Sequence, residues 1–368
     1  MQVLNLRLTR FRNFTSQEVE FCPGTNLFLG ENGQGKTNLL EAIYLFGYAR
    51  SFRTSTVKEC IQHGSQECVL NAEISHGSIL RVLGISISQA AERQLMLHRK
   101  PVGLAEFIGN LHGLAFTQEH LKVIRGGPGE RRAFLDRAMV AVCPGHMQRL
   151  ASYARALKQR NHLLATALTS GRNADRRLLD SWDEKLADEG SHVLLNRQDY
   201  VGRIKHELVN TFSDTEALEI DYEATGADTS AGSSRLKEVF LEKLAAARTR
   251  DERRGFTSVG PHRDDLKVLL NGRRLTDFGS AGQQRSCLLT LYFAQMEIHR
   301  KTCGFYPVFL MDDVEAELDD RRLRAFLEHL SHRTQTFLTT AKEHALPALG
   351  ADALRFRVLE GRISPSPS

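Results

Sequence analysis

The chain has 368 residues, 41% of them hydrophobic and 25% charged, and its formal net charge is +5 at pH 7. This composition is typical of a folded globular protein, and the length suits two or three domains or one large domain with an insertion. No apolar run approaches the length needed to span a membrane. The mild excess of positive charge allows a nucleic-acid partner but does not require one.

The cysteine pattern indicates neither a disulfide framework nor a zinc finger. No C-x-x-C pair occurs, and most of the cysteines lie among apolar residues, so we expect reduced core cysteines and no metal site built from them. The N-terminal segment contains three arginines and lacks the apolar region of a secretory signal, which favours a soluble cytosolic protein. The six cysteines are Cys22, Cys60, Cys68, Cys143, Cys287 and Cys303.

The first hundred residues are predicted to form strands around a single helix. Leu4, Leu6 and Leu8 alternate with polar residues, and residues 68–75, 79–87 and 93–98 are further strand candidates. An apolar run at 27–29 has strand character, whereas apolar residues recur at helical spacing from Leu39 to Phe46. The segment between that run and that helix therefore joins a strand to a helix N-terminus.

This joining segment fits G-x-x-x-x-G-K-[ST], the phosphate-binding P-loop. Its glycines allow backbone N–H groups to surround phosphates, and the helix dipole favours negative charge. We expect Lys36 to reach the β- and γ-phosphates of ATP and Thr37 to hold Mg²⁺. The residues of the predicted ATP site are Gly30, Glu31, Asn32, Gly33, Gln34, Gly35, Lys36 and Thr37.

The middle of the chain changes to long helical patterns, at residues 147–168, 176–208 and 234–247. We expect an inserted helical lobe over 141–255, with residues 1–140 and 256–368 forming one discontinuous lobe. Basic residues such as Arg149, Arg155, Lys158 and Arg160 make the insertion locally basic. Arg155 and Lys158 are candidate DNA contacts, as are Arg50 and Arg53 after the first helix. A solvated helix face is the alternative reading of these charges.

Strands return in the last third of the chain. Residues 267–270 and 273–275 flank Asn271-Gly272 and predict a hairpin. A helix at 284–298, a buried strand at 308–311, a helix at 321–330 and a strand at 336–338 follow, and the tail at 364–368 is expected to be disordered.

The strand at 308–311 ends in two carboxylates, Asp312 and Asp313, which is a Walker B pattern. Beside a P-loop, Asp312 is placed to hold Mg²⁺ and its water shell, together with Thr37. Asp313 follows at the same strand end, where a carboxylate can orient or deprotonate an attacking water.

A second small-residue segment, Gly279-Ser280-Ala281-Gly282-Gln283, leads into the helix at 284–298. It resembles the signature of ATP-binding-cassette (ABC) ATPases, in which one subunit's signature covers ATP on the other subunit's P-loop. The resemblance assigns Ser280, Gly282 and Gln283 to contacts across a homodimer. Glu317 and Asp319 resemble the D-loop of the same interface.

Further stretches resemble the RecF family of DNA replication and repair proteins, a branch with a short insertion instead of a long coiled coil. They are Phe11–Phe14, Ser51–Thr54, Gly127–Asp136 and Gly260–Asp265. The resemblance implies an α/β fold: an ABC-type P-loop ATPase domain, with a mixed sheet and an antiparallel β subdomain, plus an inserted, mainly α-helical lobe. It also implies a cytoplasmic DNA-binding protein that dimerises on ATP and works with RecO and RecR to direct RecA to gapped DNA.

Two positions depart from the wider pattern. Gln118 is the Q-loop candidate but lacks the usual neighbouring residues, and Thr340 stands where transporter ATPases carry a histidine. Both are candidate sensors of the γ-phosphate, and a hydroxyl in place of an imidazole predicts slow, weak ATP hydrolysis. The ATPase subunit of a transport or nuclease complex remains the alternative function.

Overall fold

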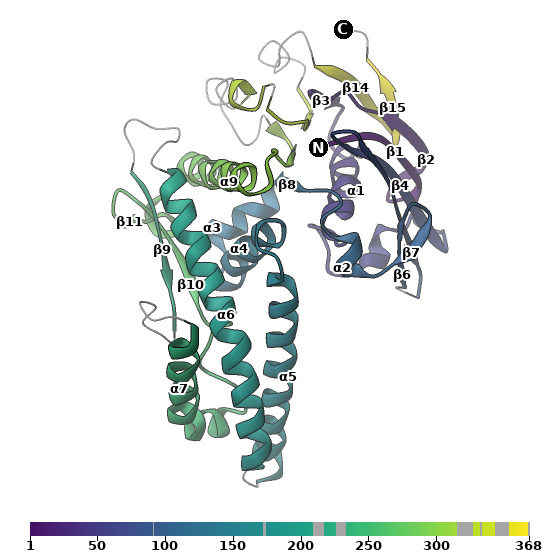
Figure 1. Cartoon of the computed structure of the whole chain (residues 1–368). Coiled ribbons are helices and arrows are strands. Elements are labelled where there is room, and N and C mark those ends of the chain that lie inside the picture. Colours follow the sequence, from purple (N-terminus) through teal and green to yellow (C-terminus); the bar gives the residue numbers. More distant parts are fainter. Residues whose placement is uncertain are drawn as a thin grey trace. The chain divides into compact units, whose positions relative to one another are not determined.

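The computed structural model describes residues 1–90, 92–171, 174–208, 217–225, 233–314, 327–331, 333–342 and 353–366 (Figure 1). The chain divides into two compact units, Met1–Leu121 with Ala281–Ser368, and Lys122–Ser280. These boundaries differ from the expected 140/141 and 255/256. The helix at Pro128–Val142 and the strand at Asp265–Leu270 belong to the second unit. Asp136 of this helix pairs with Arg197 of the long helix at Arg176–Leu208, and Arg131 of the same helix pairs with Asp265 of the strand.

A parallel sheet forms one half of the first unit. Its order is β15-β14-β3-β13-β12-β8, and every neighbouring pair is parallel except β14 with β15. The central strands are buried throughout, which explains their continuous apolar runs. The strands are β3 (Thr25–Leu29), β8 (Gly113–Phe116), β12 (Val308–Met311), β13 (Thr336–Thr340), β14 (Leu354–Leu359) and β15 (Arg362–Pro365).

An antiparallel sheet, β2-β1-β4-β5-β6-β7, forms the other half of the unit. Leu6 and Leu8 are buried as their alternation predicts, whereas a register shift between Val3 and Asn5 buries Val3 in place of Leu4. The strands are β1 (Gln2–Phe11), β2 (Phe14–Glu20), β4 (Glu67–His76), β5 (Ile79–Ser88), β6 (Arg93–Leu97) and β7 (Lys100–Val102).

Helix α1 (Lys36–Tyr48) supplies the centre of this unit's core. Its side chains are buried on nearly every face, and they share one apolar cluster with residues of both sheets. The cluster includes Cys60 and Cys68, and burial raises the pKa of each of these thiols to about 12. None of the chain's cysteines forms a disulfide. The remaining elements are η1 (Val57–Cys60), α2 (Leu104–Phe107), η2 (Gln118–Leu121) and α9 (Ala281–Cys303).

The second unit is built on long helices. Helices α5 (His146–Ser170) and α6 (Arg176–Leu208) pack along each other, α7 (Ser233–Arg254) packs on both, and a sheet of order β11-β10-β9 completes the unit (Figure 1). Asn271 and Gly272 have positive φ angles of 51° and 73°, as the predicted hairpin turn requires. The other elements are α3 (Lys122–Arg125), α4 (Pro128–Val142), β9 (Leu218–Glu223), β10 (Asp265–Leu270), β11 (Arg273–Arg274) and α8 (Leu275–Phe278).

A buried ion-pair network ties α5 to α6 and α7. The fully buried guanidinium of Arg160 donates to Asp183 at 2.5 Å and to Asp251 at 2.8 Å, and it also reaches Thr257 at 2.9 Å. Arg160 therefore does not belong to an exposed basic surface of α5. Carboxylates inside the unit neutralise its charge, because a buried guanidinium requires such partners.

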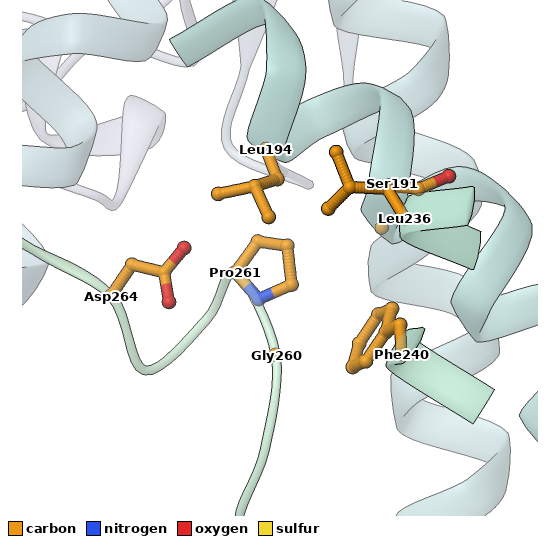
Figure 2. A pocket seen from close by; sticks show the side chains of 8 residues that line it. Ser191, Leu194, Leu236, Phe240, Gly260, Pro261 and Asp264 are labelled. Carbon is orange, nitrogen blue, oxygen red and sulfur yellow. The ribbon is translucent and has the colours of Figure 1, made fainter. Parts of the chain in front are cut away.

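The segment after α7 turns tightly against the helices. A Cβ atom at Gly260 would lie 2.6 Å from Cζ of Phe240, and its φ of +127° also excludes an ordinary side chain. A Cβ at Gly190 would lie 2.3 Å from Cε1 of Phe240. Figure 2 shows the small pocket at this junction, which Gly190, Ser191, Leu194, Leu236, Phe240, Gly260, Pro261 and Asp264 line.

Arg131 and Arg132 fix the neighbouring strand to α4. Arg131 makes a two-bond ion pair with Asp265, at 2.6 and 2.9 Å, and Arg132 donates to the Asp264 carbonyl at 2.6 Å. The stretches Gly127–Asp136 and Gly260–Asp265 therefore meet within one unit and hold it together.

Most sequence-based elements are confirmed, with differences at their ends. The helix predicted at 284–298 extends over Ala281–Cys303, and the helix predicted at 321–330 is seen at 327–330, its first six residues lying outside the described part. The prediction that the tail is disordered is wrong for Ser364 and Pro365, which belong to β15 and pair with β14. Alternating polar residues in this short edge strand hid it from the sequence analysis.

Candidate nucleotide-binding site

Four parallel strands of the first unit end at one edge of the sheet. Because β8, β12, β13 and β3 are parallel and in register, the residues that follow them gather at their carboxyl ends. Gly30 follows β3, Asp312 follows β12, Gln118 lies just beyond β8, and Thr340 closes β13. Ligands of open α/β sheets bind at this edge.

The P-loop adopts a conformation that its glycines permit. Gly33 and Gly35 have φ angles of 83° and 119°, and a Cβ at Gly30 would lie 2.3 Å from the Val358 carbonyl oxygen. Helix α1 has no side-chain cap, so its first N–H groups lack the partner that a helix start normally recruits. An uncapped helix N-terminus behind a glycine turn fits a phosphate group.

Lys36 and Thr37 are oriented by contacts within this loop and with β12. The ammonium of Lys36 donates to the carbonyls of Gly30 at 2.7 Å and Glu31 at 3.0 Å, and the residue is only 4% exposed. The hydroxyl of Thr37 donates to Oδ2 of Asp312 at 2.7 Å. The geometry thus brings together two residues that the sequence predicts as joint Mg²⁺ ligands.

Asp312 is a buried carboxylate held on both oxygens. Its Oδ1 accepts a hydrogen bond from Thr339 Oγ1 at 2.6 Å, and its backbone N–H donates to Phe116 of β8 at 3.0 Å. Thr339 Oγ1 in turn accepts from the Asp313 N–H at 2.8 Å. A hydroxyl and a carboxylate are the hard oxygen ligands that Mg²⁺ prefers, so the residues present fit this ion.

The sequence analysis named Thr340 at this position, but the hydroxyl that contacts the Walker B carboxylate belongs to Thr339. Thr340 is fully buried, and its hydroxyl exchanges hydrogen bonds with the backbone of Lys342. Side chains alternate along a strand, so only one of two adjacent threonines faces Asp312. The assignment of Thr340 and of the exposed Gln118 as γ-phosphate sensors stays a prediction.

Asp313, the predicted water-orienting residue, directly follows this network. It has a φ of +48°, a left-handed conformation that few non-glycine residues adopt but that aspartate adopts more readily than most. The Thr339 hydroxyl bonded to its N–H holds that conformation in place. The position is half-buried, so its carboxylate is not sealed from solvent.

Segments from both ends of the sequence support the P-loop. The Asn13 amide donates to the Gln34 carbonyl at 2.8 Å and accepts from Asn38 at 2.8 Å. Glu360 N–H donates to the Gln34 side chain at 2.7 Å, and Gly361 N–H donates to its carbonyl at 3.1 Å. The sequence analysis gave Asn13 no role, although the Phe11–Phe14 stretch marked its surroundings.

Arg12 and Glu41 form the ion pair beneath this loop. The Glu41 carboxylate is fully buried and accepts from Arg12 at 2.6 and 2.8 Å. Burial alone would lower the pKa of Arg12, but the hydrogen bonds and charge of Glu41 outweigh it and raise the pKa. This pair anchors the β1–β2 turn to helix α1.

The two arginines after α1 differ in their surroundings. Arg53 donates to Asn38 at 2.5 Å and lies 3.7 Å from Glu41, so its charge is partly neutralised beside the P-loop helix. Arg50 is exposed. Arg155 and Lys158 are also exposed, one turn apart on α5, and Arg155 contacts Ser152 at 3.1 Å. Their role in DNA binding stays a prediction.

The signature residues stand where the sequence places them, at a helix start. Ser280 is exposed and immediately precedes α9, whose first turn contains Gly282 and Gln283. The D-loop candidates Glu317 and Asp319 lie outside the described residues. The signature and D-loop assignments stay predictions.

No helix in the described part of the chain is both long and apolar enough to cross a membrane.

A family model described as "RecF/RecN/SMC N terminal domain" matches residues 2–356. With the P-loop and Walker B residues joined at the edge of a mixed sheet, the fold and the match define an ABC-type P-loop ATPase domain of the RecF/RecN/SMC class.

Individual relatives narrow this class. A DNA replication and repair protein RecF of Streptococcus agalactiae serotype Ia is 36% identical over 370 residues, which cover 99% of this chain and 98% of the relative. The chain belongs to the RecF family of DNA replication and repair proteins. Among solved structures, the recombination mediator protein RecF-ATPrS in the RecFOR pathway matches with a TM-score of 0.90 and 30% identity, covering 100% of this chain and 98% of that one. The corresponding RecF-ATP structure matches with a TM-score of 0.90 and 28% identity, over 99% and 97% of the two chains.

Proposed function

We propose that this chain is an ATP-dependent DNA-binding protein of recombinational repair, in which ATP controls the closing of a homodimer around DNA. The observation that carries the proposal is the hydrogen bond of Thr37 to Asp312 beneath the uncapped N-terminus of α1. It joins the two halves of a nucleotide site. The RecF relative solved with ATP supports ATP as the ligand.

The chain's own residues divide the work at this site. Lys36 and backbone N–H groups of the P-loop hold phosphate charge. Thr37 and Asp312 would hold Mg²⁺, which would supply positive charge to the phosphates. Asp313 orients the attacking water, and Thr339 keeps Asp312 and Asp313 in place. Strand β13, next to the strand that Asp313 follows, contains no histidine, so we expect ATP hydrolysis to be slow and weak.

The second copy of the chain supplies the rest of the site. Ser280 precedes the long helix α9, and Gly282 lies in its first turn. The N-terminus of this helix favours negative charge, and Ser280 is exposed. In an isologous dimer each signature would contact the γ-phosphate on the other P-loop. ATP then shifts the monomer–dimer balance by its higher affinity for the closed state.

DNA is held through its phosphates. Arg50 and the pair Arg155 and Lys158 offer exposed cations, which suit a backbone-contacting surface with little base recognition. RecO and RecR are the proposed partners, in line with the RecFOR pathway named for the solved RecF, and loading of RecA on gapped DNA is the proposed outcome.

A transport or nuclease role is less well supported. The end of β13 carries Thr339 and Thr340, where a transporter ATPase is expected to carry a histidine. Among the described residues, one cluster of three or more candidate metal ligands occurs. It consists of His112, His299 and Cys303, and it lacks the carboxylates of a two-metal nuclease.

Replacing Ser280 tests the dimer. We expect Ser280→Arg to bind ATP as the wild type does but to remain monomeric with ATP, because the bulky cation blocks the opposing site. Sedimentation velocity with and without ATP measures this. Ser78→Arg, at an exposed serine in the β4–β5 turn, is the matched control and should dimerise. An ATP-dependent dimer formed by Ser280→Arg would show that the signature does not act across subunits.

Replacing two cations of α5 tests DNA contact. Arg155→Ala with Lys158→Ala should weaken duplex binding and reduce the slope of log affinity against log salt by about 2, since each phosphate contact contributes about 0.9. Fluorescence anisotropy across a salt series in the presence of ATP gives the slope. Lys205→Ala is the control, because Asp221 already neutralises that lysine at 3.1 Å. An unchanged slope in the double variant would place the DNA elsewhere.

A further inference from the structure

Two histidines and a cysteine gather in the first unit at the amino ends of the parallel strands, away from the P-loop edge. His112 directly precedes β8, and His299 and Cys303 lie one turn apart at the end of α9. Nδ1 of His112 is 2.6 Å from Nε2 of His299. One ligand atom of each of the three side chains lies within 4.8 Å of the others. Sequence analysis missed this group because no short motif connects its members.

The outer nitrogens of the two histidines fix their tautomers. Nε2 of His112 is 3.0 Å from the Gly109 carbonyl, and Nδ1 of His299 is 2.8 Å from the Phe305 carbonyl. A carbonyl oxygen can only accept, so each of these nitrogens carries the proton. The two inner nitrogens are therefore both lone-pair acceptors, and they face each other at hydrogen-bonding distance.

Two facing lone pairs repel unless a positive species lies between them. His299 is only 4% exposed, and the Phe305 ring lies 5.0 Å from it and 5.4 Å from His112. A metal ion binds neutral imidazoles through these lone pairs, so it would be the positive species between the two rings.

We propose that His112, His299 and Cys303 form a Zn²⁺ site. Imidazole nitrogens and a thiolate are preferred zinc ligands, and outer N–H groups bonded to carbonyls orient ligand histidines in the same way. With Zn–N bonds of about 2.1 Å in tetrahedral geometry, the two inner nitrogens would move apart to roughly 3.4 Å. Cys303 binds as the thiolate and releases its proton to solvent, and one coordination position stays open to water.

Such a site would connect the segment before β8 to the C-terminal turn of α9. The opposite end of α9 contains the signature residues Gly282 and Gln283. The unfolded chain does not hold the three ligands together, so Zn²⁺ binding adds to the stability of the folded unit. The site is independent of the proposed function, because it shares no residue with the P-loop or Walker B strand.

The test is Zn²⁺ binding by the full chain, first treated with chelator and held without ATP. We expect one Zn²⁺ per chain in a competition titration against a chromophoric chelator. His299→Ala and Cys303→Ser should each weaken binding at least tenfold. His63→Ala and Cys22→Ser, which alter the same residue types elsewhere in the first unit, should leave it unchanged.

Two further measurements separate ligation from misfolding. Co²⁺ in place of Zn²⁺ should give a thiolate charge-transfer band that Cys303→Ser abolishes, and each variant should retain ATP binding. His112→Gln, at a half-buried position in a loop, provides a second histidine test if His299→Ala loses ATP binding. Absence of saturable Zn²⁺ binding overturns the proposal. It is also overturned if the cluster variants bind Zn²⁺ as tightly as the wild type, or if the control variants lose as much Zn²⁺ affinity as the cluster variants do.

Discussion

Lys36→Met is expected to weaken ATP binding by roughly 100-fold. The lysine is almost fully buried, and its ammonium is held by the carbonyls of Gly30 and Glu31, which fixes it at the mouth of the P-loop. A charge-assisted contact between this ammonium and a phosphate of ATP is worth up to about 3 kcal/mol. Losing it corresponds to a loss of affinity of roughly 100-fold. Isothermal titration with ATP and Mg²⁺ measures the change.

Methionine keeps the length and apolar character of the lysine stem, so the fold should survive the substitution. Lys58→Met is the matched control: it removes an exposed lysine of the same unit and should bind ATP normally. If Lys36→Met bound ATP within threefold of the wild type, the P-loop assignment would have to be abandoned.

Arg160→Ala is expected to cause the largest loss of stability in the second unit. Removing the guanidinium leaves Asp251, which is fully buried, and Asp183, which is 3% exposed, without this partner. Breaking a buried ion pair from one side costs about 3–5 kcal/mol, because a charge remains desolvated. Urea unfolding followed by tryptophan fluorescence reports it, since Trp182 adjoins Asp183 on α6.

Arg155→Ala provides the comparison on the same helix, because Arg155 is exposed and contacts only a neighbouring serine. Its effect on the free energy of unfolding should stay within about 0.5 kcal/mol. Equal destabilisation by the two substitutions would mean that helix propensity, and not the ion-pair network, determines the loss.

How far the sequence predicts the site depends on how local each feature is. The P-loop is a contiguous motif whose strand, turn and helix are encoded within twenty residues, so its fold and the roles of Lys36 and Thr37 follow directly from the pattern. The Walker B pattern likewise places Asp312 after a buried strand, and the structure joins it to Thr37. The choice between Thr339 and Thr340 depends on which face of β13 meets β12, and no local pattern determines that.

A charge pattern in the sequence does not show which charges are neutralised by tertiary contacts. Arg160 and Lys158 are equivalent in composition, but only one of them points inward between three helices. The expected lobe boundaries failed to match the two compact units for a related reason. Ion pairs between residues far apart in sequence join α4 to the long helix α6, through Arg197 and Asp136 at 2.8 Å, and join β10 to α4, through Arg131 and Asp265.

The position of β3 in its sheet bears on how the chain is made. This strand carries the P-loop at its end, but both of its neighbours, β13 and β14, are synthesised near the end of the chain. During translation the motif therefore emerges long before any partner strand can pair with it. Such long-range pairing folds slowly and leaves strand edges exposed, whereas all strands of the antiparallel sheet and all elements of the second unit precede β13 in the chain. The nucleotide cannot stabilise the chain until Asp312, after β12, and Thr339, in β13, have been synthesised.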